Sequence, residues 1–322
     1  MKPFAAVHVT DLHLADRDFG NHVPGVQEEL WQMLEEVADL CIEEQRDLFI
    51  TGDLFEHKQA RLVSHSLVSR LLQYFGRLQE HGVETYLIAG NHDLTADGMN
   101  SLSRQPLGVL AVSGFVQFPL VPVRHESGVW ITPLHFDRRG EYDPEFYRVP
   151  RPEEGAPHIV MAHGSLSSKR HTYNFDHIPY DEVAQDTIDL LLWGHFHEDH
   201  GAETTGKTTF VNFGSFCRRS RKQQRPVRIA LIDGAEVGGK YKFKVEPYTL
   251  TSARPWQGLF NDVVDEYVPL IDPEVTGLAQ DLASLYAFED IDIGELLRSR
   301  AESHAVPEEV IERAIHYLDQ VA

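Results

Sequence analysis

The stretch Leu192-Trp193-Gly194-His195-Phe196-His197 places two histidines directly after an apolar run. That run, from Ile188 to Trp193, predicts a buried strand, and Gly194 lets the backbone turn sharply at its end. Residues two apart on an extended chain face the same side, so both imidazoles can point to one place. Imidazole is the commonest metal-binding side chain at neutral pH. One such motif is weak by itself, so its meaning depends on what ends the other strands.

Four other predicted strands end in residues of the same chemical kind. The runs 4–10, 47–51, 83–89 and 158–162 lead into Asp11-Leu12-His13, Gly52-Asp53, Gly90-Asn91-His92-Asp93 and His163-Gly164. Taken singly, each is an ordinary loop with polar residues. Together they repeat one arrangement, in which nitrogen and oxygen donors follow a strand.

The first half of the chain alternates strands with helices. Residues 24–45 and 61–80 each carry apolar residues at helical spacing on one face. A β-α-β-α-β order predicts parallel strands joined by right-handed crossovers. In such sheets functional residues collect at the carboxyl ends of the strands, which is where these donors lie.

From about Gly114 onward the pattern changes to successive short strands. We expect them at 115–118, 129–136, 158–162, 188–193, 208–213, 227–232 and 241–248. The later ones have little helix between them, which favours antiparallel hairpins. The simplest architecture is α/β, with two stacked mixed sheets flanked by helices.

Composition limits the class of protein. The chain has 322 residues, of which 42% are hydrophobic and 25% charged, as in ordinary globular proteins. Its two cysteines, Cys41 and Cys217, exclude a disulfide framework. No apolar stretch is long enough to span a membrane, and the first residues lack a signal peptide, so we expect a cytoplasmic protein. The net charge of −21 argues against indiscriminate binding to nucleic acid or anionic membrane.

The last part of the chain differs from the rest. Residues 251–322 hold 15 acids and 4 bases, a net charge of −11, and carry helical apolar stripes. We expect a catalytic domain over residues 1–250 and an acidic helical extension over residues 251–322. The extension either packs its stripes on the core behind a solvated acidic face, or serves as a docking surface for a partner.

Seven donors at five strand ends are more than one ion needs. They suit two divalent ions that share one carboxylate. Asp53 lies between the two ligand groups in the chain and is the natural bridge. One ion would take Asp11, His13, Asp53 and His197, and the other would take Asp53, Asn91, His163 and His195. A hydroxide shared by both ions would be a nucleophile near neutral pH. We expect Mn²⁺, with Fe²⁺, Zn²⁺ or Mg²⁺ as alternatives.

This series of motifs resembles the calcineurin-like metallophosphoesterase superfamily, in order, over about residues 4–215. The resemblance implies a four-layer α/β/β/α sandwich and the division of ligands given above. It also implies that His92 is the catalytic histidine, which stabilises the phosphoryl group or protonates the leaving oxygen. Many members carry Asp three residues after the bridging Asp, to pair with this histidine. Here Glu56 occupies that position, and Asp93 is the competing candidate for supporting His92.

Within the superfamily the chain is most similar to the SbcD-type DNA repair nucleases, which implies DNA as substrate. The resemblance also implies an SbcC-like ATPase as partner, through the C-terminal helices, and a homodimer. Two alternatives stay open. One is a phosphodiesterase or phosphatase for small substrates, and the other is a subunit that acts mainly by binding the ATPase.

A basic run follows the last ligand strand. Arg218, Arg219 and Arg221, with Lys222, Arg225 and Arg228, have no acid among them. Lys169 and Arg170 follow His163, and Arg138 and Arg139 follow another strand. If these loops surround the ions, they form a positive rim for a phosphate backbone. The alternative is a solvated hairpin.

Overall fold

Three parallel strands and two helices build the first half of the protein. The strands β1 (Phe4–Val9), β2 (Asp47–Thr51) and β3 (Thr85–Ile88) lie side by side in that order. The helices α1 (Val26–Glu43) and α2 (His65–Glu80) connect them. The structure is a computed structural model, which describes residues 3–19, 22–57, 62–168 and 176–261. The predicted β-α-β-α-β order and its parallel pairing are confirmed.

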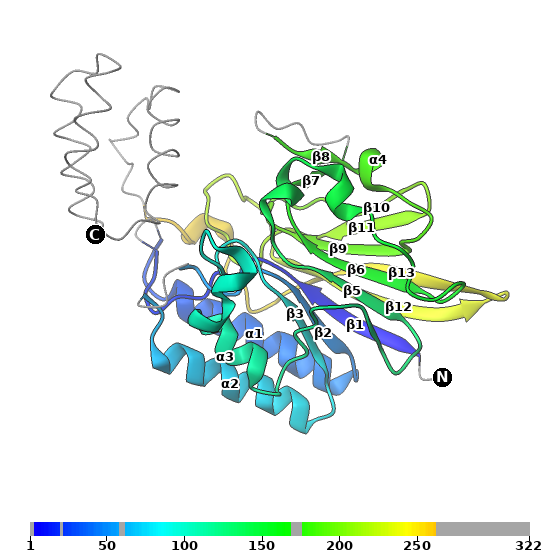
Figure 1. The fold of residues 1–322 in the computed structure, drawn as a ribbon. Helices are drawn as coiled ribbons and strands as arrows, with labels where there is room; N and C mark the ends of the chain where they lie inside the picture. The colour runs from blue at the N-terminus through cyan, green and yellow to red at the C-terminus, as the bar shows by residue number, and fades with distance from the viewer. Residues whose placement is uncertain (1–2, 20–21, 58–61, 169–175, 262–322) are drawn as a thin grey trace, which may run out of the picture. The chain divides into compact units, whose positions relative to one another are not determined.

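Both helices form because their apolar residues fall on one face. In α1, Leu30, Leu34 and Val37 are buried at helical spacing. The helix α2 begins later than the predicted residue 61, because the Ser64 hydroxyl accepts a hydrogen bond from Leu67 N at 3.0 Å and caps the first turn. The two helices lie side by side against one face of the β1-β2-β3 strands (Figure 1).

Two mixed sheets carry the rest of the described chain. The first has the order β13-β12-β1-β2-β3, and its strands β12 (Arg228–Val237) and β13 (Lys240–Thr249) form an antiparallel hairpin. The second has the order β10-β11-β9-β6-β5-β4. Its strands are β4 (Val123–Arg124), β5 (Trp130–Leu134), β6 (His158–His163), β9 (Leu190–Gly194), β10 (Gly201–Thr205) and β11 (Thr208–Asn212). The short strands β7 (Leu166–Ser167) and β8 (Ile178–Pro179) pair separately.

The predicted hairpins are only partly right. β5, β6, β9 and β11 are parallel neighbours, although little helix separates them in sequence. Residues 115–118 do not form a strand, because only Gln117 pairs with β3, in an isolated bridge to Tyr86. Short helices were missed, among them η2 (Gly98–Arg104) and α3 (Pro106–Val112).

Alternation along the strands divides the core into layers. On β1, Ala6 packs between the two sheets, while Val7 packs toward the helices. On β9, Leu192 faces the first sheet and Trp193 faces outward, onto a cluster with α4 (Tyr180–Val183). The layers are therefore helix, sheet, sheet and helix, as predicted, but the second helical layer is made of short pieces such as η3 (Arg138–Glu141) and η4 (Pro144–Tyr147).

Only the beginning of the acidic extension falls in the described residues. There Trp256–Gly258 forms one short 3-10 turn, η5, and Leu259 and Phe260 pack against Val26 of α1. The helical stripes predicted beyond residue 261 lie outside the described residues, and the boundary at residue 250 stays a prediction. None of the helices in the described part of the chain has the length and apolar character needed to cross a bilayer.

Candidate metal centre

The carboxyl ends of β1, β2, β3, β6 and β9 meet at one place. The loops after β1 and β2 run side by side, with Asp11 N donating to Gly52 O at 3.2 Å and His13 N donating to Asp53 O at 3.0 Å. The ends of β6 and β9 are joined in the same way, by Gly164 N donating to Gly194 O at 3.1 Å. This convergence brings donors together that lie up to 186 residues apart in the sequence.

Glycines let these loops approach one another closely. A Cβ atom at Gly90 would collide with the Asp53 carboxylate, and one at Gly194 would collide with the Thr10 hydroxyl. Each of these glycines directly precedes a predicted ligand. The Gly-ligand pairs in the sequence therefore have a steric cause, because only a residue without a side chain fits between adjacent strand ends.

The backbone is strained at the predicted ligands. Among the described non-glycine residues, positive φ occurs at Asp11 (53°), His13 (50°), Asp53 (51°), His195 (110°) and Gln45 (51°), the last at the end of α1. Such conformations cost roughly 1–3 kcal/mol each and persist where the surroundings enforce them. Four of the five lie in this cluster, which marks it as a functional site.

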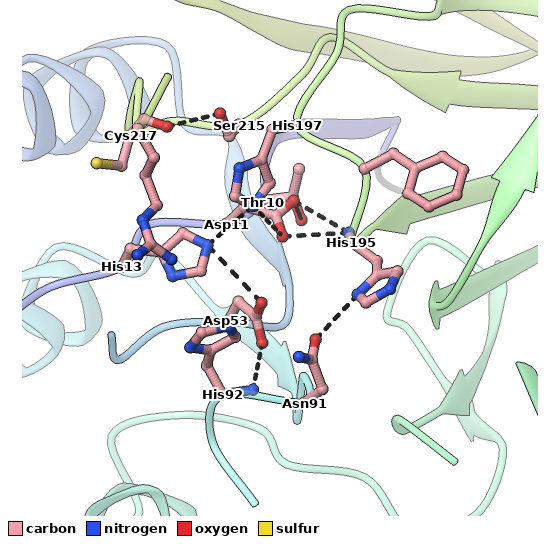
Figure 2. A network of polar contacts seen from close by, with 12 residues as sticks. Thr10, Asp11, His13, Asp53, Asn91, His92, His195, His197, Ser215 and Cys217 are labelled. Atoms are coloured by element: carbon pink, nitrogen blue, oxygen red, sulfur yellow. Dashed lines mark hydrogen bonds and ion pairs between the residues drawn. The ribbon is translucent and has the colours of Figure 1, made fainter. Parts of the chain in front are cut away.

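The donors of the Asp11 side face one another. His13 Nε2 lies 3.0 Å from His197 Nε2 and 3.7 Å from Asp53 Oδ2, and His197 Nε2 lies 3.8 Å from Asp11 Oδ1 (Figure 2). Asp11, His13 and Asp53 are fully buried. Burial holds the pKa of His13 and His197 well below the usual value, so both rings are neutral, which is the form that binds metals.

The Asn91 side has an equivalent arrangement around the other Asp53 oxygen. Asn91 Oδ1 lies 3.0 Å from His163 Nε2 and 2.9 Å from His195 Nδ1. Asp53 Oδ1 lies 3.5 Å from His163 Nε2. Because Oδ2 of the same carboxylate faces His13, Asp53 borders both groups of donors. All seven predicted ligands therefore lie in one cluster, in the predicted two groups.

The charge state of the cluster fits two cations. Burial raises the pKa of Asp11 to about 7. Burial alone would lower the pKa of His163, but the carboxylate of Asp53 outweighs it and raises the pKa to about 9. Asp11 and His163 therefore hold protons near neutral pH, where a cation would take their place. Asp/His groups within this cluster have ligand atoms close enough to hold a metal.

His92 lies at the border of the cluster. Its backbone N–H donates to Asp53 Oδ1 at 2.7 Å, and its Nδ1 donates to the main-chain oxygen of Glu56 at 2.7 Å. Its ring lies edge-on to that of His13, with centroids 4.9 Å apart. Because Nδ1 is held by Glu56, Nε2 is the nitrogen that can act on a substrate.

Glu56 and Asp93 do not support His92 in the predicted way. The Glu56 carboxylate turns to His13 Nδ1, 3.0 Å away, and to Arg219, 2.6 Å away, so Glu56 meets His92 through its main chain. The buried Asp93 carboxylate accepts bonds from three backbone amides, those of Gly90, Leu54 and Phe55. Asp93 therefore ties the Asp53 loop to the Asn91 loop.

The basic run does not form one continuous rim. Arg218 is only 3% exposed, and its guanidinium lies 3.0 Å from Glu29 of α1, so its predicted substrate contact is wrong. Arg225 is directed at main-chain oxygens, and Arg228 pairs with Asp199. Arg219 is half-buried beside the cluster and Arg221 is exposed. Lys169 and Arg170 lie outside the described residues.

Several residues at this site were not predicted from the sequence. The main-chain oxygen of Thr51 accepts from His163 Nδ1 at 2.7 Å. The Phe136 ring lies 6.0 Å from that of His163, and Glu141 Oε1 lies 3.7 Å from His195 Nε2. A main-chain acceptor leaves no mark in the sequence. Phe136 and Glu141 follow β5, whose end joins the same edge, and that position was an available signal.

Comparisons with known proteins found one family and two individual proteins that are similar to this chain. The profile of the calcineurin-like phosphoesterase family matches residues 4–199. The chain is 25% identical over 202 residues to an uncharacterized metallophosphoesterase, YhaO, of Bacillus subtilis (strain 168), a match that covers 60% of this chain and 48% of that protein. It thus spans about half the length of this relative. Among solved structures it is similar to Vacuolar Protein Sorting 29 from Cryptosporidium parvum, with a TM-score of 0.32 and 11% identity over 77% of this chain and 98% of that one.

Proposed function

Because this chain belongs to the calcineurin-like phosphoesterase family, a family of metal-dependent phosphoester hydrolases, we propose that it is a phosphodiesterase that cuts DNA. The nuclease activity would be of the SbcD type, exonucleolytic or endonucleolytic. The observation that carries the proposal is the position of Asp53, whose two carboxylate oxygens face two separate sets of donors.

Two divalent ions held there would neutralise the phosphate and activate water near neutral pH. The residues of the chain have distinct tasks around them. Asp53 and Asn91 fix the spacing of the two donor groups, and Thr51 holds the His163 ring in place through Nδ1. The family normally binds two such metals, and we expect Mn²⁺, with Fe²⁺, Zn²⁺ or Mg²⁺ as alternatives.

His92 is positioned to protonate a leaving oxygen. Its bond to the Glu56 main-chain oxygen fixes the ring, so that Nε2 carries the transferable proton. A protonated ring would donate from Nε2 to the leaving group, and a neutral ring would afterwards take a proton from water. The His92 backbone amide donates to Asp53 Oδ1, and this closeness to the proposed bridging carboxylate supports a role for His92 as the acid.

The choice of DNA depends on basic residues beside the cluster or at the surface, although Arg139 also pairs with Asp137 and Arg221 also donates to the main-chain oxygen of Asn261. Arg221, Arg138 and Arg139 are exposed, and Arg219 lies beside the cluster. They would contact the phosphate backbone, together with Lys169 and Arg170. A small phosphodiester is the second candidate. It is favoured by the net charge of −21 and by the pairing of Arg219 with Glu56, which removes part of the positive charge.

Three substrates distinguish these functions. Metal-free protein would be supplied with Mn²⁺ or Mg²⁺ and incubated with end-labelled duplex DNA, end-labelled single-stranded DNA and bis(p-nitrophenyl) phosphate. Cleavage of DNA and of the model diester supports the nuclease. Cleavage of the model diester alone supports the small-substrate enzyme, and no metal-dependent cleavage of any of the three contradicts both.

The partners and the location of the protein are part of the same proposal. An SbcC-like ATPase would bind the acidic extension, and the enzyme would act as a homodimer in the cytoplasm. Removing residues 262–322 should leave cleavage of the model diester intact if the extension serves only to bind a partner. Loss of that cleavage, in a truncated protein that remains folded, would contradict this role.

A further inference from the structure

The segment Phe213–Arg225, which we call the clamp loop, follows β11 and contacts the Asp11 side of the metal centre. Its base is fixed to the helical layer, because the buried Arg218 guanidinium donates to Glu29 at 3.0 Å and to the main-chain oxygen of Arg254 at 2.7 Å. Gln223 holds the loop in shape by accepting from the amides of Arg219 and Ser220 at 2.7 and 2.8 Å. The clamp loop is therefore a rigid support.

Three groups of the clamp loop converge on the main-chain oxygen of His197. Arg225 Nη2 donates to it at 2.8 Å, Ser215 N at 3.1 Å and Gln223 Nε2 at 3.3 Å. The other Arg225 nitrogen, Nη1, donates to the oxygens of Phe213 and Pro226. One carbonyl with three donors is held firmly, so the clamp loop sets where the His197 ring points.

The same loop reaches two more ligands of the Asp11 side. Cys217 N donates to the main-chain oxygen of Asp11 at 3.2 Å. Arg219 lies 2.6 Å from Glu56 Oε1, and Glu56 Oε2 lies 3.0 Å from His13 Nδ1. This contact lacks hydrogen-bond geometry, so Glu56 limits where the His13 ring can lie through packing and charge. Arg219 thereby acts on His13 through Glu56.

The Asn91 side is held by other parts of the protein. His163 is oriented by Thr51 at the end of β2, and the His195 backbone N–H donates to the Asp11 carboxylate at 3.1 Å. Asn91 lies in the loop that Asp93 ties to Leu54 and Phe55. The side chains of the two halves thus have different supports, and the shared contact is the bond from the His195 backbone to the Asp11 carboxylate.

We propose that the clamp loop is a positioning element for one of the two ions only, the ion between Asp11, His13, Asp53 and His197. Arg219 and Glu56 orient His13, and Arg225 orients His197. This inference rests on the proposed function in one respect, since it requires that two ions bind. It predicts that substitutions of residues that touch neither ion can weaken the binding of one ion without weakening the binding of the other.

The test measures metal affinity in two backgrounds by calorimetric titration of metal-free, full-length protein with Mn²⁺. Asp11→Asn retains only the ion of the Asn91 side, and Asn91→Ala retains only the ion of the Asp11 side. In the Asn91→Ala background, Arg219→Gln should lower the affinity for the remaining ion by about tenfold, because loss of an outer-shell partner of a metal ligand has an effect of this size. In the Asp11→Asn background it should change affinity by less than about twofold.

Two further variants complete the design. Arg225→Gln should repeat the pattern through an independent contact, and Arg221→Gln, an exposed arginine of the same loop, should leave both affinities unchanged. Thermal unfolding of each metal-free variant checks that the fold persists. Equal weakening in both backgrounds, or no weakening in either, by folded Arg219→Gln and Arg225→Gln proteins would overturn the inference. A wild-type chain that binds no Mn²⁺ would instead refute the proposed function.

Discussion

The metal centre and the clamp loop both concentrate charged and polar side chains. They differ in whether these groups find partners within the fold. In the clamp loop, Arg218 is paired with Glu29, and Arg225 donates to main-chain oxygens. In the metal centre, donor atoms of Asp11, Asp53 and the histidines face one another, and the raised pKa values of Asp11 and His163 let these two hold protons near neutral pH. Polar groups that are satisfied within the fold stabilise it, whereas groups that converge on each other without compensation bind something else.

This contrast predicts that the two regions respond differently to mutation. Ligand substitutions should lower activity without lowering the stability of the metal-free protein. Substitutions of the buried clamp arginine should lower stability. A ligand variant that unfolds the metal-free protein, or an Arg218 variant that is as stable as the wild type, would contradict this difference.

The largest effect is expected for Asp53→Asn. This change keeps the shape of the side chain but removes the charge that both donor groups share, so both ions should be lost. The activity on a model diester should fall by more than the roughly 10²–10⁴-fold that loss of a general acid costs. Metal content and diester hydrolysis measure this, with urea unfolding of the metal-free variant as control. Retention of two tightly bound ions would refute the bridging role.

The next largest effect is expected for His92→Ala. The ring is held by Glu56 but lies outside both predicted ligand sets, so metal content should stay at two ions per chain. Turnover should fall by roughly 10²–10⁴-fold, the contribution of a general acid. A leaving group of low pKa, such as p-nitrophenolate, should reduce the loss, because it needs little protonation. Cleavage at nearly the wild-type rate with a poor leaving group would contradict the assigned role.

Within the clamp loop, Arg218→Leu and Arg221→Gln form a matched pair. Loss of one partner from a buried ion pair costs about 3 kcal/mol or more of unfolding free energy, since a charge is left behind. Arg221 is exposed, so its substitution should change stability by less than about 0.5 kcal/mol. Urea unfolding of the metal-free proteins compares the two. Equal stability of both variants would show that Arg218 is not a structural residue.

The last prediction concerns His8, a buried group outside both regions. Its Nε2 lies 2.8 Å from the Thr51 hydroxyl, and burial lowers its pKa to about 3. As the pH falls, His8 therefore takes up a proton in the unfolded chain before it does so in the folded protein. The stability that neutral His8 contributes is complete above pH 6.5 and is lost as the pH falls toward 3. The contribution is at most about 1.4 kcal/mol per pH unit. His8→Gln should reduce the pH dependence of the unfolding free energy by this slope, and an unchanged slope would contradict it.

The position of the ligands was predictable for a topological reason. Parallel strands end at one edge of a sheet, so Asp11, Asp53 and Asn91 had to lie close together once β1, β2 and β3 were identified. His163, His195 and His197 follow from the same rule in the second sheet. Their grouping into one cluster needed no knowledge of side-chain packing.

The partners of the loop side chains were not predictable in this way. Arg218 pairs with Glu29, but many other acids lie at a comparable separation along the sequence, so this partner could not be singled out. The rotamer of Glu56 decides whether its carboxylate contacts His92 or His13, and the sequence does not give that rotamer. Strand direction was likewise misjudged for β9 and β11, which are parallel although only a short hairpin strand, β10, lies between them in sequence. Each of these outcomes depends on long-range packing.

Two cations should lie on either side of the Asp53 carboxylate, and anomalous diffraction from crystals of the full chain soaked in Mn²⁺ tests this directly. We predict two peaks per chain, one between Asp11, His13 and His197 and one between Asn91, His163 and His195, with Asp53 bordering both. A single peak, or peaks away from Asp53, would contradict a two-ion centre at this carboxylate.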